Sequence, residues 1–545
     1  MVYILACLLF IFAFFSLSPL VRIFFSVDWS AGITALNSPS LQSAIINTLF
    51  VSGSVALLSV IASLFLAFLL VRTDLPWPRG LTNLLTLPYV IPPFIGAIGW
   101  IILANPSSGL INQIFGFQAL NIYTYAGVIF VEFSFLFILA LLPLMTAFQK
   151  IDPSLEEAAR LSGCKPHQVL WQILVPLLKK HLIGYFLLIF MAVAASFGVP
   201  ALLGGPARVF FLTTQIYTLQ KMGTMNGLYQ ALFLSCLMLL SVILLYFGQH
   251  SLLQTRDFHT ISGKTSRPSL FHLKQWKWPL FGAVIFFWCL VFLLPVLGLM
   301  ASAFSQVPGK YSWDNLSLQQ FETILFETEE TKRALKNSFL LAASTATAAV
   351  GISFFLTISA KKILSEKWKK TLETFVSIPY AMPGSVIALS LIVAFSQGIY
   401  GVGPSLYNTL FIIFIAYNIK YLSLAYSTTQ NALHSLHPSL VEAAALSGAN
   451  SWNKIRFIFF PLVRSSLFAA WVLVFIPCLS ELTMTQLLTG PGRETLGTLI
   501  FQLQEYSDMG GGGPAALSLL LIVILFILQS LVRVLSKFSP GGKNR

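Results

Sequence analysis

Two short acidic segments of this chain share one pattern of residues. Residues 154–163 read SLEEAARLSG and residues 439–448 read SLVEAAALSG. In each, a serine stands three positions before a glutamate, the spacing at which the two side chains cap the start of a helix. Gly163 and Gly448, six positions after those glutamates, suit the left-handed residue that closes a helix. The pattern predicts a helix of about two turns, roughly 12 Å long, with an acidic beginning.

The small residues of this pattern indicate contact with another protein rather than catalysis. Alanine side chains beside an acidic helix end let the backbone of a partner come close. One copy alone would be read as a well-capped surface turn, the usual setting of a capping box. Two copies with the same alanine step and glycine spacing favour docking. The predicted docking residues are Glu156, Glu157, Ala158, Ala159, Gly163, Glu442, Ala443, Ala444 and Gly448.

Three charged residues lie inside long apolar stretches: Glu132, Lys420 and Glu481. A charge at the centre of a bilayer costs about 3 kcal/mol on insertion scales and is functional by default. We expect all three to line or gate a pathway, and we expect Glu132 to pair with Lys420 across it. The alternative is that Glu132 lies near the membrane interface, or that either side chain reaches that interface by snorkelling.

Residues for other chemistries are missing from the sequence. A phosphate-binding P-loop needs Gly-x-x-x-x-Gly-Lys-Ser/Thr, and the one Gly-Lys-Thr, at Gly263-Lys264-Thr265, has Phe258 where the first glycine is required. There is no His-Glu-x-x-His, no nucleophile elbow and no Cys-x-x-Cys among the five cysteines. We therefore expect no catalytic residues, no bound metal and no cofactor held by this chain.

The elements that position these residues are predicted to be membrane helices. The chain has 545 residues, of which 56% are hydrophobic and only 10% charged, and its mean hydropathy is +0.81, which leaves too little polar surface for a soluble globule. Apolar runs of about 20 residues, enough to span roughly 30 Å of hydrocarbon, recur throughout. The expected fold is an all-α integral membrane protein with about 12 transmembrane helices, near residues 3–25, 44–71, 81–104, 125–148, 182–203, 228–249, 279–304, 337–360, 375–397, 409–430, 466–488 and 514–536.

Prolines interrupt the third and ninth of these spans. They are Pro88, Pro92 and Pro93 in the first case and Pro379 and Pro383 in the second. A proline inside a membrane helix frees carbonyl groups that a cavity or a neighbouring element must satisfy. We expect two kinked helices that line the pathway, with simple packing as the alternative.

The chain is an internal duplication. A shift of 285 residues superposes the two docking segments, and a shift of 291 superposes LPYVIPP at 87–93 on IPYAMPG at 378–384. Each repeat holds six spans, so the halves have the same polarity and are expected to be related by an axis along the membrane normal. The predicted domains are a first unit at 1–249 with its docking loop at 150–180, a linker at 250–278, and a second unit at 279–545 with its docking loop at 434–465.

Lysine and arginine set the expected orientation. With the N-terminus inside, they concentrate on the cytoplasmic side in an excess of about threefold. Both termini and both docking segments are then cytoplasmic. This distribution accounts for the net charge of +14 without a nucleic-acid partner, which would need a clustered basic face. The basic segments are 72–80, 149–181, 250–278, 361–370, 431–465 and the C-terminal tail.

The two docking segments, EEAARLSG followed by ILVPLL and VEAAALSG followed by IFFPLV, resemble the EAA loops of ABC importer permeases, the inner-membrane components of binding-protein-dependent transport systems. The resemblance covers residues 42–250 and 333–536 and implies two fused permease units of the type I importer kind in a bacterial inner membrane. It also implies two copies of an ATPase subunit, which bind ATP and receive the two short coupling helices, and an extracytoplasmic solute-binding protein. The motif acid is Glu157 in one loop and Glu442 in the other, where Val441 replaces Glu156.

The cargo is suggested by two further stretches. SELTMTQLLTGPGRETLGTLIFQL at 480–503 and LPYVIPPFIGAIGW at 87–100 look most like ferric-iron permeases. The expected function is the translocation subunit of a ferric-iron importer. The alternatives are the same architecture importing thiamine, a phosphonate or a polyamine, a twelve-helix secondary transporter driven by an ion gradient, and a membrane-embedded scaffold. A gradient-driven carrier would have no use for matched docking loops.

Overall fold

The computed structural model describes residues 2–253, 270–310, 312–506 and 511–537. Regular structure in these residues is helical, and the only β pairings among them are isolated bridges. This confirms the predicted all-α class. Most of the linker, with the Gly-Lys-Thr triplet at 263–265, lies outside the described residues.

The described residues contain nine helices long and apolar enough to span a membrane, and twelve candidate spans, in the predicted order, if each of three bent helix pairs is counted as one. Three spans are broken by a bend. The bend is 93° between α5 (Pro78–Thr86), with the turn that follows it, and α6 (Pro93–Ala104). It is 44° between α8 (Tyr125–Leu136) and α9 (Ile138–Lys150), and 100° between α19 (Glu366–Ala381) and α20 (Gly384–Phe395). Nine are uninterrupted: Val2–Ser26 (α1 to α2), Pro39–Arg72 (α4), Pro166–Ala194 (α11 to α12), Met225–Gln249 (in α14), Lys274–Ala303 (α15 to α16), Glu329–Ile363 (α18), Leu410–His434 (α21), Ser451–Leu479 (α23 to α24) and Gly512–Leu531 (in α27).

The bounds predicted for the fifth and eleventh spans were wrong. We expected 182–203 and 466–488, but the helices run over Pro166–Ala194 and Ser451–Leu479. Each is followed by a separate short helical segment, Pro200–Gly204 in the first half and α25 (Thr483–Leu488) in the second. These segments are buried in protein, and non-helical backbone at membrane depth is tolerated only in such a setting or beside a cavity. Because these segments are apolar, hydropathy assigns them to the preceding membrane span, although the helix is interrupted before each of them.

The two halves repeat the same packing. In the first, α4 packs against α9 and α12; in the second, α18 packs against α21 and α24. Matching hydrogen bonds form near the N-terminal ends of α4 and α18: the side-chain amide of Asn47 donates to the carbonyl of Phe210 at 3.0 Å, and that of Asn337 donates to the carbonyl of Glu494 at 2.9 Å. The duplication seen in the sequence is therefore a structural one.

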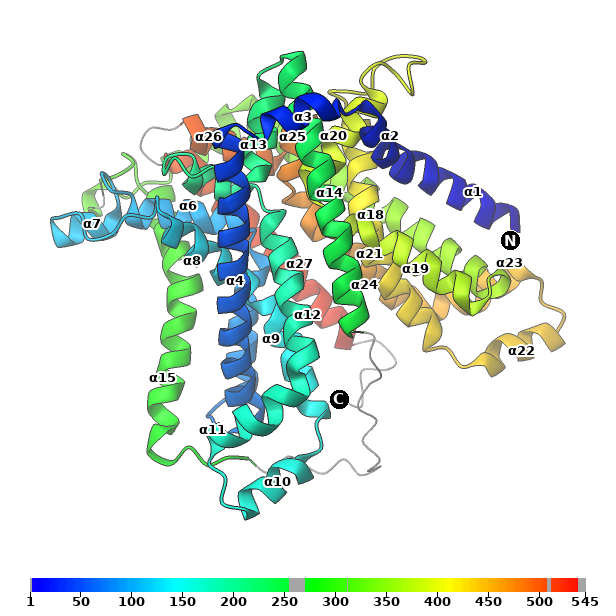
Figure 1. The fold of residues 1–545 in the computed structure, drawn as a ribbon, viewed down its shortest axis with the longest axis horizontal. Helices are drawn as coiled ribbons and strands as arrows, with labels where there is room; N and C mark the ends of the chain where they lie inside the picture. The colour runs from blue at the N-terminus through cyan, green and yellow to red at the C-terminus, as the bar shows by residue number, and fades with distance from the viewer. Residues whose placement is uncertain (1, 254–269, 311, 507–510, 538–545) are drawn as a thin grey trace.

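The halves are interlocked through their first helices. The helix α1 (Val2–Phe12) packs against α18, and α2 (Ser18–Ser26) packs against α20, both in the second half. Conversely α16 (Leu294–Ala303), at the start of the second half, packs against α6 in the first. Figure 1 shows α1 beside α18 and α19, away from α4. The helices at the start of each sequence unit therefore pack against the other unit.

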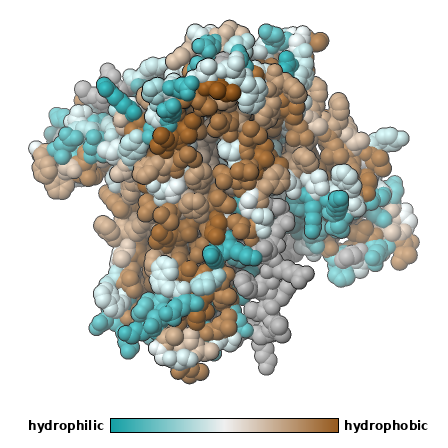
Figure 2. All heavy atoms as spheres, in the orientation of Figure 1, coloured by the Kyte–Doolittle hydropathy of each residue, from teal (hydrophilic) through white to brown (hydrophobic). Residues whose placement is uncertain are grey.

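The surface of the molecule fits a membrane setting. Large apolar side chains are exposed on the outer helices, among them Leu57 and Phe65 on α4 and Leu244 on α14. Figure 2 shows hydrophobic residues over the flank formed by these helices, with hydrophilic residues gathered toward the ends of the molecule. The exposed leucines and phenylalanines are accounted for by lipid contact.

Candidate functional site

Two short helices carry the repeated acidic pattern: α10 (Pro153–Leu161) and α22 (Pro438–Leu446). They lie at the lower and right-hand margins of Figure 1, away from the packed bundle. The predicted closing glycines are confirmed, with φ of +85° at Gly163 and +75° at Gly448. After each, a backbone N–H bonds back five residues, from Cys164 to Ala159 in one case, as in a Schellman cap.

The helix starts differ from the prediction. Pro153 and Pro438 take the first helical position, so the cap is the residue before them rather than the serine. Asp152 accepts a hydrogen bond from the backbone N–H of Ser154 at 2.9 Å, and His437 Nδ1 accepts one from that of Ser439 at 3.3 Å. The expected serine–glutamate capping box is therefore replaced by an Asx-type turn and its histidine equivalent.

Each short helix presents the same side chains outward. Leu155 and Leu440 are 47% and 45% exposed, and Leu161 and Leu446 are both 91% exposed. Between them lie the exposed acid and the first alanine of the pattern, while the second alanine is half-buried. We call Leu155, Glu157, Ala158 and Leu161, with Leu440, Glu442, Ala443 and Leu446, the docking surfaces. The leucines were missed at the sequence level, although their equal spacing in both repeats was visible there.

Glu156 does not belong to the docking surface. Its carboxylate forms an ion pair of 2.9 Å with Arg72 at the end of α4, and the two side chains are 3% and 1% exposed. Arg72 also donates to the carbonyls of Phe148 and Ile151 at 2.7 and 3.1 Å. This pair braces the first docking loop against the C-terminal ends of α4 and α9.

The second half lacks this brace. Val441 stands in place of Glu156, and Lys362, which takes the position of Arg72 when α18 is matched to α4, donates to Ser451 Oγ at 3.0 Å. A cavity of about 360 Å³ lies there, lined by Lys362, Val441 and Glu442 among others. The two docking surfaces are alike, but their supports are not.

A larger cavity, of about 570 Å³, lies between the halves. Of the predicted pathway residues, Glu132, Lys420, Glu481 and Pro92 line it. Lys420 and Glu132 do not form an ion pair among the described residues, so the predicted pairing is not made in this structure. The positive charge of Lys420 instead lies 5.9 Å from the centre of the Tyr421 ring.

Glu481 is held by the helix that follows it. Its carboxylate accepts hydrogen bonds from the backbone N–H groups of Met484 and Thr485 at 2.9 and 3.0 Å, and from Thr485 Oγ1 at 2.7 Å. These contacts place the acid at the N-terminus of α25, where a negative charge is favoured. The carboxylate therefore has donors of its own while it borders the cavity.

The remaining predicted prolines mark the breaks in the third and ninth spans. Pro92 and Pro383 precede α6 and α20 in extended conformation, with ψ of 134° and 135°. Just before them, the carbonyls of Pro88 and Pro379 accept from the backbone three residues on, at 3.1 and 3.2 Å. The expected kinks are thus full breaks, with the same turn in both halves.

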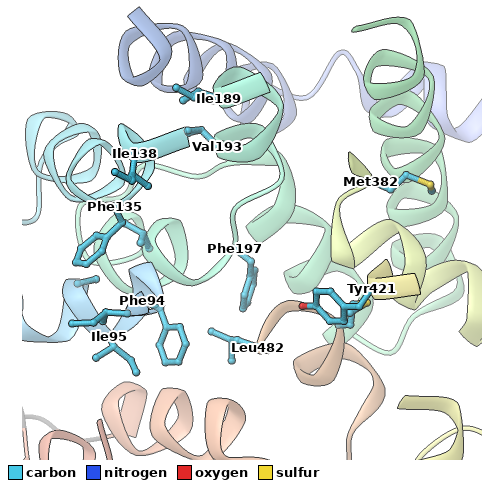
Figure 3. Packing of buried hydrophobic residues seen from close by; sticks show 14 of the residues in the cluster. Phe94, Ile95, Phe135, Ile138, Ile189, Val193, Phe197, Met382, Tyr421 and Leu482 are labelled. Carbon is cyan, nitrogen blue, oxygen red and sulfur yellow. The ribbon is translucent and has the colours of Figure 1, made fainter. Parts of the chain in front are cut away.

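Apolar side chains form one wall of the cavity. Phe94, Phe197, Leu482 and Tyr421 are among its lining residues, and Figure 3 shows the first three gathered close together with Tyr421 to their right. Phe197 and Leu482 are repeat equivalents at the shift of 285. A Cβ added at Gly198 would lie 2.6 Å from Phe94 Cβ and 3.1 Å from Leu482 Cδ2, so a residue without a side chain is needed for this approach.

Comparison with known proteins places this architecture in a family. The model of the family described as "Binding-protein-dependent transport system inner membrane component" matches residues 59–257 and again residues 349–538. The ferric transport system permease protein FbpB of Actinobacillus pleuropneumoniae is 26% identical over 544 residues, covering 96% of this chain and 77% of that protein. The Fe(3+)-transport system permease protein FbpB 2 of Haemophilus influenzae is 25% identical over 520 residues, covering 92% of each chain.

Among solved structures, a chain of a bacterial alginate ABC transporter, in complex with a pentasaccharide-bound periplasmic protein, matches with a TM-score of 0.40 and 21% identity, over 49% of this chain and 98% of that one. The two family matches fall on the two structural repeats and take in both short acidic helices. The chain belongs to the inner-membrane components of binding-protein-dependent transport systems, the permease subunits of ABC importers, and it is a multi-pass inner-membrane protein with two such units fused in one polypeptide.

Proposed function

We propose that this chain is the translocation subunit of a ferric-iron importer. In this proposal a separate ATPase subunit binds ATP, one copy engages each docking surface, and an extracytoplasmic solute-binding protein delivers the iron. Both termini and both docking surfaces then face the cytoplasm. The observation that carries the proposal is the matched pair of docking surfaces, each with one leucine that is 91% exposed.

The docking surfaces have the chemistry of a protein interface. Burying a leucine side chain is worth about 1.5–3 kcal/mol, so burial of Leu161 on one helix and of Leu446 on the other would each contribute to the affinity for the partner. Glu157 and Glu442 are exposed beside them and would select a basic groove on the partner, since charge complementarity fixes orientation and specificity.

The support for iron as cargo is independent of the docking surfaces. The two relatives named for ferric transport align over 92% and 96% of this chain. The cavity between the halves is lined by the carboxyl groups of Glu132 and Glu481, and oxygen donors are what hard cations take in proteins.

The docking part is tested by the double variant Glu157→Arg/Glu442→Arg. We expect the ATPase to lose co-purification with the permease and the reconstituted complex to lose cargo-stimulated ATP hydrolysis. The control is Glu330→Arg, which reverses an exposed acid at the start of α18. Unchanged association and hydrolysis in the double variant would contradict the docking role.

A second candidate cargo is a phosphonate. Lys420 lines the cavity without an ion pair among the described residues, and an ammonium group is suited to a phosphonate oxygen. Uptake into proteoliposomes separates the two cargoes: radioactive ferric iron is expected to accumulate on addition of ATP, whereas accumulation of a labelled phosphonate alone would make this second function the correct one.

A further inference from the structure

Glu132 is the least satisfied charged group of the described residues that border the central cavity. Its side chain is 0% exposed, and neither carboxyl oxygen has a hydrogen bond of normal geometry within the part of the chain that the structure describes, although the hydroxyl of Ser196 interacts with the group. An ionised carboxylate buried without donors carries a large desolvation cost. The residue lines the cavity of about 570 Å³ that lies between the halves.

Comparison of the two halves shows how unusual this position is. At the shift of 285, Glu132 corresponds to Tyr417 and its neighbour Ser196 corresponds to Glu481. In the second half, Tyr417 is joined to Glu481 through Thr485, with oxygen–oxygen distances of 2.8 and 2.7 Å. Each half therefore has one carboxylate at this pair of equivalent positions. In the first half it is at the first position (Glu132), and in the second half it is at the second position (Glu481).

The two carboxylates differ in what they can do. Glu481 is occupied by the N–H groups of Met484 and Thr485 and by a hydroxyl. Glu132 has both oxygens free of such donors, with the hydroxyl of Ser196 nearby. To bind a cation, Glu132 gives up at most its contact with Ser196, whereas Glu481 would give up three donors.

We propose, on the basis of the iron-import function above, that Glu132 binds the ferric ion directly as it crosses the cavity, with the hydroxyl of Ser196 as a second oxygen donor. A trivalent cation supplies the counter-charge that the buried carboxylate lacks. One carboxylate with a hydroxyl holds the ion weakly enough to release it, which passage requires. Lys420, which also lines the cavity, disfavours a second cation and keeps the ion on the Glu132 side.

The test uses the complete importer in proteoliposomes, with ATPase and binding protein, and measures radioactive ferric iron taken up per ATP hydrolysed. For Glu132→Gln we expect iron uptake per ATP hydrolysed to fall at least tenfold, because a charge-assisted contact to the ion is lost. Glu330→Gln, at an exposed site on α18, is the matched control and is expected to behave as wild type.

Relocation of the carboxylate is the second arm. In Glu132→Gln/Ser196→Glu the acid moves to the position that Glu481 holds in the other half, and we expect uptake to recover at least half of the loss. If the Gln variant does not assemble, Glu132→Asp and Glu132→Asn form a matched pair, in which Asp must retain at least tenfold more uptake.

Three results would overturn the inference: wild-type uptake per ATP in Glu132→Gln, no recovery on relocation, or equal uptake by Asp and Asn. Failure of the proposed function is a separate outcome, seen when the wild-type complex itself takes up no iron.

Discussion

The brace between Arg72 and Glu156 makes a quantitative prediction about the first docking loop. The pair is almost fully buried, with an N–O distance of 2.9 Å. Breaking a buried ion pair by removing one partner costs about 3–5 kcal/mol, because the other charge is left without compensation. In Glu156→Gln, Arg72 keeps its contacts to the carbonyls of Phe148 and Ile151, and the amide oxygen can still accept a bond. We therefore expect Glu156→Gln to destabilise the first docking loop by about 3 kcal/mol, the lower end of this range.

Hydrogen exchange measures this cost locally. A change of 1.4 kcal/mol is a factor of ten in an opening equilibrium, so amides of residues 152–164 should exchange about 100-fold faster in Glu156→Gln. Residues 437–449, the same loop in the half with Val441, are an internal reference and should be unchanged. The control Glu157→Gln alters an exposed acid one position on and should leave both loops within twofold. Equal exchange of residues 152–164 in Glu156→Gln and wild type would refute the brace.

Three more predictions follow from described contacts. Leu161→Asp/Leu446→Asp should weaken ATPase binding at least tenfold, because two apolar side chains can no longer be buried at the interface; titration of the purified ATPase checks this. Gly198→Ala should cost about 1–3 kcal/mol by overpacking and lower the melting temperature, whereas Gly53→Ala, which meets nothing within 4 Å, should not. Asp74 accepts from the backbone N–H of Leu273 at 2.9 Å, and this bond lowers the pKa of its carboxyl. The contact is therefore present at neutral pH and lost only as pH falls below the usual aspartate range, and Asp74→Ala should increase chymotrypsin cleavage after Phe271.

Hydropathy predicted the order of the membrane spans because the property it measures, contact with lipid or protein, is what makes these helices apolar. It misplaced the ends of the fifth and eleventh spans for the same reason. The segments Pro200–Gly204 and Thr483–Leu488 are apolar because protein surrounds them, and a window of residues cannot distinguish burial in protein from burial in lipid. The crossing of α1 and α16 to the opposite half is likewise a matter of long-range packing that no local pattern encodes.

In the candidate site, too, features with a local sequence cause were predictable, and features that depend on long-range packing were not. Gly163 and Gly448 were predictable because a left-handed helix end has a local sequence cause. The burial of Glu156 was not predictable, because it depends on an ion pair with Arg72, a residue far from it in the sequence. The prediction that Glu132 and Lys420 pair failed in this structure since repeat equivalence gives matching positions in two halves but not the distance between them. Both residues nonetheless line the cavity between the halves.

The central claim is that this permease couples ATP hydrolysis by a partner to import of ferric iron. The most direct measurement is ATP hydrolysis by the permease reconstituted with its ATPase and solute-binding protein, with ferric iron, thiamine, a phosphonate and a polyamine offered in turn. We predict stimulation by the iron-loaded binding protein and by none of the other three ligands. Stimulation by a different ligand would overturn the cargo, and a verified intact complex that no ligand stimulates would contradict the coupling itself.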